Sequence, residues 1–108
     1  MKDWEIIFYK TGSGRKPVQE FIDGLSDKDQ AKIAWGIGLL EQYGVFLKRP
    51  YLAHLYDKLW ELRAGRYRIF LSCFSRKRIL LLHVILKKTQ KVPKKDLKLV
   101  EQRLKQFM

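Results

Sequence analysis

The stretch that decides the fold is residues 59–86, LWELRAGRYRIFLSCFSRKRILLLHVIL. Its leucine-rich, β-branched and aromatic runs predict three strands, at residues 59–63, 67–74 and 79–86. The connections between them are too short for anything but antiparallel neighbours. In the last strand both alternating sets of side chains are apolar, which is typical of a central strand covered on both faces. The stretch therefore predicts an antiparallel meander.

Outward from the meander, the N-terminal segment predicts a strand and a short helix. Residues 4–9 are rich in aromatic and β-branched residues, and turn-forming residues follow at 11–14. The helix begins at Pro17, because a first helical position does not need the N–H that proline lacks. Its apolar face has helical spacing and consists of Val18, Phe21, Ile22 and Leu25.

A second helix is predicted from Ser26 to about Tyr43. Ser26 and Asp29 have the spacing of a capping box, in which both side chains accept backbone N–H groups. Gly44 supplies the left-handed stop. Residues 45–57 are predicted to form a long, irregular, basic and aromatic loop.

A last helix is predicted to begin at Pro93, and it completes the order β-α-α-β-β-β-α in one domain spanning residues 1–108. This order indicates an α+β fold with an antiparallel sheet. The two early helices should cover one face of the sheet. A basic groove should remain on the other face, with the last helix closing one end of it.

Charge is the strongest feature of the composition, at a formal net +12. Residues 1–47 carry six Lys/Arg and seven Asp/Glu, net −1, whereas residues 48–108 carry seventeen and four, net +13. A scattered excess of charge would indicate no more than a solvated surface. Concentration of the excess in one part of the chain favours nucleic-acid binding.

Other classes of protein and site are disfavoured by the sequence. No apolar run precedes a small-residue cleavage site, and no uncharged run is long enough to span a bilayer. Cys73 is the single cysteine, so no internal disulfide forms, and cysteine and histidine are too few for a zinc site. We expect a cytoplasmic protein with no metal or other cofactor.

Two basic clusters are candidate sites. Arg66 and Arg68 should share one face of their strand, because strand side chains alternate, and guanidinium groups bind phosphate oxygens with two parallel hydrogen bonds. Ion pairing of these arginines with Glu61 or Asp57 is the plainer interpretation. The second cluster is the lysine-rich run 87–93, where a strand leads into a helix N-terminus. Such a run is often only a solvated loop.

Candidates for proton transfer are fewer. His54 lies in the basic loop and could titrate near neutral pH, whereas His83 lies in an apolar strand and is more typical of a hydrogen-bonded core residue. Glu61 could be a general base or a partner of an arginine. Trp4, Trp35 and Trp60 are expected in the core rather than in a base-stacking platform.

Four segments together resemble the phage-derived, HigB-like branch of the RelE/ParE toxin superfamily, and the resemblance covers nearly the whole chain. They are Trp60-Glu61-Leu62-Arg63, Gly65-Arg66-Tyr67-Arg68-Ile69-Phe70, Leu81-Leu82-His83 and Lys87-Lys88-Thr89-Gln90-Lys91-Val92-Pro93.

The resemblance implies a ribosome-dependent endoribonuclease that cuts messenger RNA without a metal, with the RNA 2′-hydroxyl as nucleophile. Arg68 matches the strand arginine that stabilises the transition state, and Lys87 or Lys88 matches the basic residue near the leaving group. Arg63 would bind phosphate. Further candidate RNA contacts from the basic segments are Arg66, Lys91, Lys94 and Lys95.

The chain departs from the RelE pattern at the position of the general base. Glu61 stands where some relatives have lysine, and no tyrosine or histidine lies near the C-terminus. The candidates for the base are Glu61, His54 and Tyr67, in that order, and catalysis could also rest mainly on arginine and lysine charge.

The resemblance also implies partners. These are the ribosome with its messenger and a cognate antitoxin, a small helix-turn-helix protein like HigA, through which alone operator DNA would be bound. The alternative is a ParE-like inhibitor that binds DNA gyrase and catalyses nothing, since one fold can carry either function.

Overall fold

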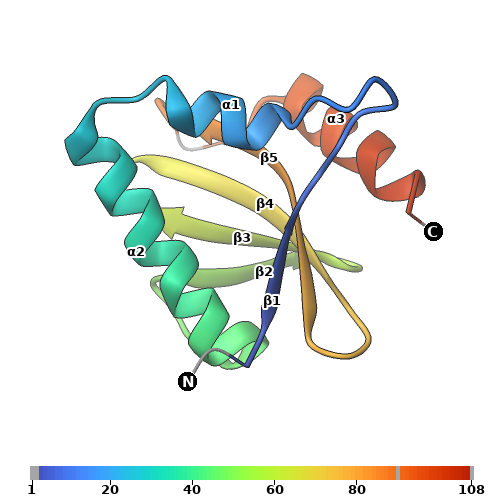
Figure 1. Ribbon diagram of the computed structural model, residues 1–108, viewed down its shortest axis with the longest axis horizontal. Coiled ribbons are helices and arrows are strands. Elements are labelled where there is room, and N and C mark those ends of the chain that lie inside the picture. The colour runs from blue at the N-terminus through green and yellow to red at the C-terminus, as the bar shows by residue number, and fades with distance from the viewer. Residues whose placement is uncertain (1–2, 90, 108) are drawn as a thin grey trace.

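The computed structural model describes residues 3–89 and 91–107 and has the predicted α+β class. Figure 1 shows three helices packed around one twisted sheet. The strands are Glu5–Phe8 (β1), Leu52–Tyr56 (β2), Leu59–Ala64 (β3), Tyr67–Phe74 (β4) and Arg78–Leu86 (β5). The helices are Pro17–Asp23 (α1), Asp27–Tyr43 (α2) and Lys94–Lys105 (α3), with a short 3-10 turn, η1, at Gly44–Phe46.

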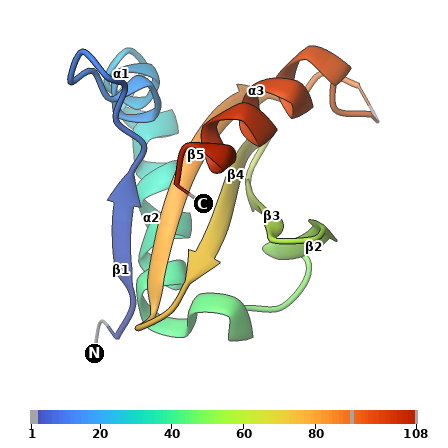
Figure 2. The ribbon, with the colours of Figure 1, turned by 90° about the vertical axis from the view of Figure 1, so that its right-hand side faces the viewer.

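The sheet has the strand order β1-β5-β4-β3-β2, with β5, β4 and β3 in its interior. The predicted meander β3-β4-β5 is confirmed, because both of its pairings are antiparallel. β1, however, pairs with β5 in parallel, with Glu5 opposite Arg78. The prediction of a purely antiparallel sheet is therefore wrong. Figure 2 shows the two strands side by side although they lie far apart in the chain.

The predicted loop at residues 45–57 contains a further strand. β2 pairs antiparallel with β3, with Leu52 opposite Leu62 and His54 opposite Trp60. It lies at the edge of the sheet, where one set of backbone groups has no partner strand. The order of elements therefore has four consecutive strands before α3, one more than predicted.

Two hydrophobic cores lie on opposite faces of the sheet. The face toward α1 and α2 buries Ile33, Leu62 and Ile69, among others. The opposite face buries Phe70 and Leu82 against Val100 and Leu104 of α3. Figure 2 shows α1 and α2 on one side of β4 and β5 and α3 on the other. The two early helices cover one face, as predicted, but α3 packs on the other face, which was predicted to remain a groove closed by this helix only at one end. We call this second face the α3 face.

The starts of α1 and α2 agree with the predicted caps, but α3 begins at Lys94, one residue later than predicted. Gly44 has the predicted positive φ, but its ψ of −133° lies outside the left-handed helical region. The Ser26 hydroxyl accepts a hydrogen bond from the Asp29 N–H, as predicted. The Asp29 carboxylate does not complete the capping box, because it accepts a hydrogen bond from the Tyr67 hydroxyl on β4. Gly44 ends α2 with a φ of 56°, and a Cβ added there would overlap the Trp4 ring. The chain therefore passes close against Trp4 at this point.

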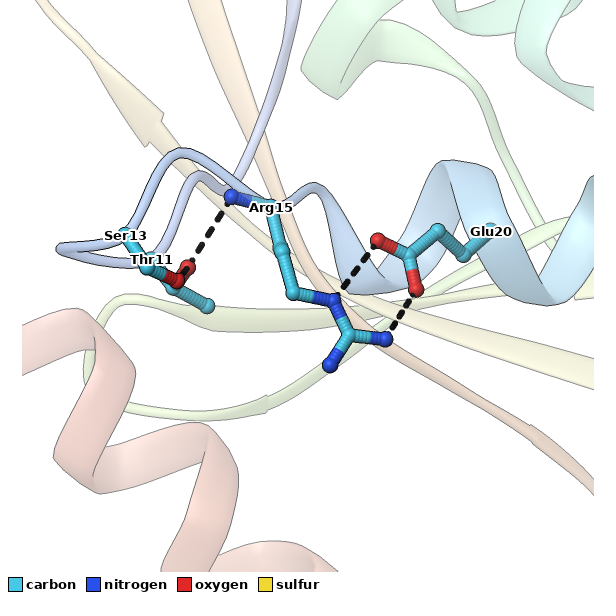
Figure 3. A network of polar contacts seen from close by, with 4 residues as sticks. All are labelled: Thr11, Ser13, Arg15 and Glu20. Atoms are coloured by element: carbon cyan, nitrogen blue, oxygen red, sulfur yellow. Dashed lines mark hydrogen bonds and ion pairs between the residues drawn. The ribbon is translucent and has the colours of Figure 1, made fainter.

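The turn between β1 and α1 is held by polar side chains. The Thr11 hydroxyl accepts a hydrogen bond from the Arg15 N–H, and the Arg15 guanidinium binds the Glu20 carboxylate through two nitrogens (Figure 3). This contact with Arg15 keeps the pKa of the Glu20 carboxyl below its ordinary value. Both side chains are exposed, so the pair orders the start of α1 but contributes little stability.

Among the described residues, no helix is both long enough and apolar enough to cross a membrane. No three of the described His, Cys, Asp and Glu side chains gather closely enough to hold a metal ion. Burial of Cys73 raises the pKa of its thiol to about 11, so the thiol stays protonated at neutral pH.

Candidate functional site

The candidate site lies on the α3 face, at the end of the sheet where β3 turns into β4. Arg63 and Arg68 are directly opposite each other in the β3–β4 register. Glu61 is two residues from Arg63 and opposite Phe70, so its side chain is on the same face. Like charges opposite each other in a sheet are destabilising, so each arginine needs a compensating contact.

Arg68 finds its contacts in the backbone of the turn. Its Nη1 donates to the carbonyl oxygens of Gly65, at 2.7 Å, and Tyr67, at 2.9 Å. These bonds fix the guanidinium beside the turn. Its Nε is buried and has no acceptor among residues 3–89 and 91–107. A buried donor without a partner costs about 1–3 kcal/mol, which an anionic acceptor at this position would recover.

Arg63 is compensated by Glu61. Its Nε donates to the Glu61 Oε2 at 3.1 Å, and the Glu61 residue is only 2% exposed. One of the two roles predicted for Glu61, pairing with an arginine, is therefore observed. A buried carboxylate is tolerated here because the guanidinium beside it supplies both charge and a donor.

We expect Arg63→Ala to destabilise the protein by about 1–3 kcal/mol, because it leaves the Glu61 carboxylate buried without its partner. In a domain of this size that corresponds to a fall in melting temperature of roughly 5–15 °C. Glu61→Gln should cost less, since an amide oxygen still accepts the bond without a buried charge. The double variant Glu61→Gln/Arg63→Ala should regain most of the stability that Arg63→Ala alone loses. Thermal melting tests this, and an Arg63→Ala protein that melts with the wild type would contradict it.

The second basic cluster lies next to the turn. The backbone N–H of Lys87 donates to the Arg66 carbonyl at 2.8 Å, which extends the β4–β5 ladder by one bond. A pocket of about 170 Å³ follows between the end of β5 and the start of α3. Its lining includes Lys87, Lys88, Lys91 and Asp96. The structure thus brings Lys87 to the Arg68 turn and gathers the lysine run around one cavity. Gln90, also in this run, lies outside the described residues.

A titratable pair on the α3 face was missed by sequence reasoning. His83 Nε2 lies 2.8 Å from Asp96 Oδ1, and both side chains are mostly buried. The His83 ring stacks on Phe70, with ring centroids 6.3 Å apart. His83 is thus a hydrogen-bonded, partly buried residue, as its apolar strand predicts. Asp96 could have been found as the acidic residue in the first turn of an otherwise lysine-rich helix.

Two of the three candidate bases lie on the other face of the sheet. Tyr67 points toward α1 and α2. Its hydrogen bond to the Asp29 carboxylate raises the pKa of the phenol, whereas a general base needs a lowered pKa. His54 is opposite Trp60 on the face covered by α1 and α2, and its Nε2 lies 2.7 Å from the Asp57 carbonyl. Of the three, Glu61 alone lies on the face of Arg68.

The remaining candidates are at the rim. Arg66 lies in the turn, because β4 begins at Tyr67, so the prediction that it shares a strand face with Arg68 is wrong. Lys94 and Lys95 are exposed in the first turn of α3. Trp35 is 58% exposed, which corrects its predicted place in the core.

Comparison with known proteins gives a family. No curated protein matches the chain. A family described as phage-derived protein Gp49-like (DUF891) matches residues 20–105, a segment that includes every candidate residue of the site. The match runs from α1 to the end of α3 and so covers most of the fold. The chain therefore belongs to the Gp49-like family of phage-derived proteins.

Proposed function

We propose that this protein is the toxin of a type II toxin-antitoxin system and that it inhibits translation by cutting messenger RNA on the ribosome. The Gp49-like family is linked to RelE-like toxins, which supports the first part. The net charge of +12 supports a polyanionic target. The partner is an acidic segment of an antitoxin, for which the same charge provides complementarity.

The observation that carries the proposal is the pair of opposed arginines beside Lys87. Arg68 is held by two backbone carbonyls and keeps one donor that no described residue accepts, and Arg63 lies across from it. Arg68 is a preorganised cation, because two backbone carbonyls already fix its guanidinium, so it can stabilise the charge that develops on a phosphorane without reorganising as the reaction proceeds.

In the proposed reaction the RNA 2′-oxygen attacks the adjacent phosphorus and the bond to the 5′-oxygen breaks. Arg63 and Arg68 stabilise the phosphorane, and Lys87 or Lys88 donates the proton that the 5′-oxygen takes up. Glu61 accepts the proton of the 2′-hydroxyl, as the candidate base on the correct face. Its carboxylate is buried against Arg63, so the RNA phosphate must first draw Arg63 away. Proton transfer of this kind contributes typically about 10²–10⁴-fold.

We expect expression of the chain alone to arrest growth and translation, because free toxin would act on every translated message. Primer extension after brief induction should map cuts inside translated frames and nowhere in untranslated RNA. Co-expression with the antitoxin, a second arm of the same experiment, should restore growth. Growth arrest with intact messages and stalled gyrase would instead identify a ParE-like inhibitor.

A further inference from the structure

A second basic and aromatic surface lies outside the face of Arg68. A pocket of about 460 Å³ lies between α2 and the β3–β4 turn. Lys28, Lys32 and Trp35 line it from α2, Tyr51 from the segment before β2, and Arg63 and Gly65 from β3 and its turn. None of the proposed catalytic steps uses this pocket, although Arg63 borders both places.

Two exposed aromatic rings form one wall. Trp35 is 58% and Tyr51 39% exposed, and their rings meet edge to face with centroids 5.4 Å apart. An edge-to-face contact uses one ring face only, so further faces stay available for stacking. α2 packs closely on β3 beside this point, since a Cβ on Gly36 would lie 3.4 Å from the Leu62 side chain. Close packing at Gly36 leaves the neighbouring Trp35 at the border of the helix–sheet contact.

Two lysines of α2 line the same pocket beside Trp35. Lys28, Lys32 and Trp35 follow the spacing of one helix face, so all three project toward the pocket. The Lys32 side chain lies over Gly65, where a Cβ would be 3.4 Å from its Cδ. Within residues 3–89 and 91–107, neither lysine has a carboxylate at ion-pair distance. Their charge is therefore available to an anion from outside the protein.

We propose that this pocket binds one nucleotide of single-stranded RNA, with the base stacked on Trp35 and the phosphate between Lys28 and Lys32. The combination of stacking rings and a cationic wall fits a ligand that alternates planar bases with phosphates. Arg63 lines the pocket, and its side chain lies on the α3 face opposite Arg68, so a polyanion that passes around the β3–β4 end of the sheet at Arg63 reaches the proposed cleavage site. The choice of RNA rather than DNA rests on the proposed function.

The test is the affinity of the purified full-length chain for fluorescein-labelled hexaadenylate and hexauridylate, measured by fluorescence anisotropy. Trp35→Ala should weaken hexaadenylate binding about tenfold, because stacking on an aromatic side chain contributes that much for a strongly stacking base. The affinity of Trp35→Ala for hexauridylate should fall less. Trp35→Phe should retain most of the affinity, since a smaller ring still stacks.

The lysines should act through salt dependence. Lys28→Ala/Lys32→Ala should lower the slope of log affinity against log salt by about 1.4, the value for two phosphate contacts on a single strand. Lys10→Ala/Lys16→Ala removes the same charge from exposed lysines outside the pocket and should leave the slope unchanged. Phe46→Ala, at a ring that is 75% exposed elsewhere, is the matched control for Trp35. Thermal melting confirms that each variant is folded.

Three outcomes decide against the pocket. The first is a Trp35→Ala protein that binds hexaadenylate like the wild type, and the second is a Phe46→Ala protein that loses as much affinity for it as Trp35→Ala does. The third uses polyglutamate as an additional probe in the same assay, and it is a Trp35→Ala protein that loses affinity for polyglutamate alone. The last would identify a docking surface for an acidic polypeptide. Messenger cleavage on ribosomes, measured in parallel, keeps the two proposals apart. A wild-type chain that cuts no message but binds oligonucleotides through Trp35 contradicts the proposed function alone.

Discussion

Arg68→Ala should lower the rate of message cleavage about a hundredfold or more while leaving the protein folded. A charge-assisted contact that strengthens as the phosphorane forms contributes roughly 3 kcal/mol, on the scale of an oxyanion-hole donor. The fold should tolerate the change. Within the part of the chain that the structure describes, the Arg68 side chain donates only to the carbonyls of Gly65 and Tyr67, and its removal also eliminates a buried donor that has no acceptor there. The measurement is single-turnover cleavage on programmed ribosomes.

Two further variants make this result specific. Arg68→Lys should restore little activity, because a point charge cannot keep two carbonyl bonds and also offer a two-pronged contact to phosphate. Arg15→Ala removes an arginine that is also held by local contacts but belongs to the turn in Figure 3, and it should cut like the wild type. An Arg68→Ala protein that melts and cuts like the wild type would remove Arg68 from the mechanism.

Gly44→Ala should destabilise the protein strongly, although it adds a single methyl group. The new Cβ would overlap the Trp4 ring, and a φ of 56° disfavours any L side chain. The backbone strain alone costs about 1–2 kcal/mol, and displacement of the indole adds roughly as much again. The melting temperature should fall by about 10 °C or more.

Gly38→Ala is the matched control for Gly44. Gly38 lies inside α2, and a Cβ there would meet no atom within 4 Å. Alanine should therefore stabilise the helix by up to about 1 kcal/mol. Thermal melting of both variants tests the contrast. Equal melting temperatures for the two would contradict the close approach of Trp4 to the end of α2.

The sequence predicted correctly those helices and strands that depend on residues close together in the chain. The starts of α1 and α2 follow Pro17 and Ser26, and β4 follows its run of aromatic and β-branched residues. β2 was missed because it is a short edge strand that begins just after Lys48, Arg49 and Pro50, a segment that reads as loop. Its strand character depends on pairing with β3, which is a tertiary contact.

The packing of helices on the sheet could not be predicted from the sequence either, because it also depends on tertiary contacts. The amphipathic pattern of α3 gives an apolar stripe but not the sheet face on which that stripe packs. Arg68 and Lys87 could be placed near each other because neighbouring strands carry them. The contact of His83 with Asp96 and the exposure of Trp35 could not be predicted, since both depend on how a helix lies on the sheet.

The parallel pairing of β1 with β5 also constrains how the chain folds during its own synthesis. Glu5 pairs with Arg78, so β1 cannot pair with β5 until 73 further residues have been added to the chain. At typical elongation rates of about 5–20 residues per second this takes roughly 4–15 s. Throughout that interval Ile6, Ile7 and Phe8 have no strand to pair with, and a nascent-chain chaperone would find its target there. The sheet is complete only when β5, Arg78–Leu86, has been made.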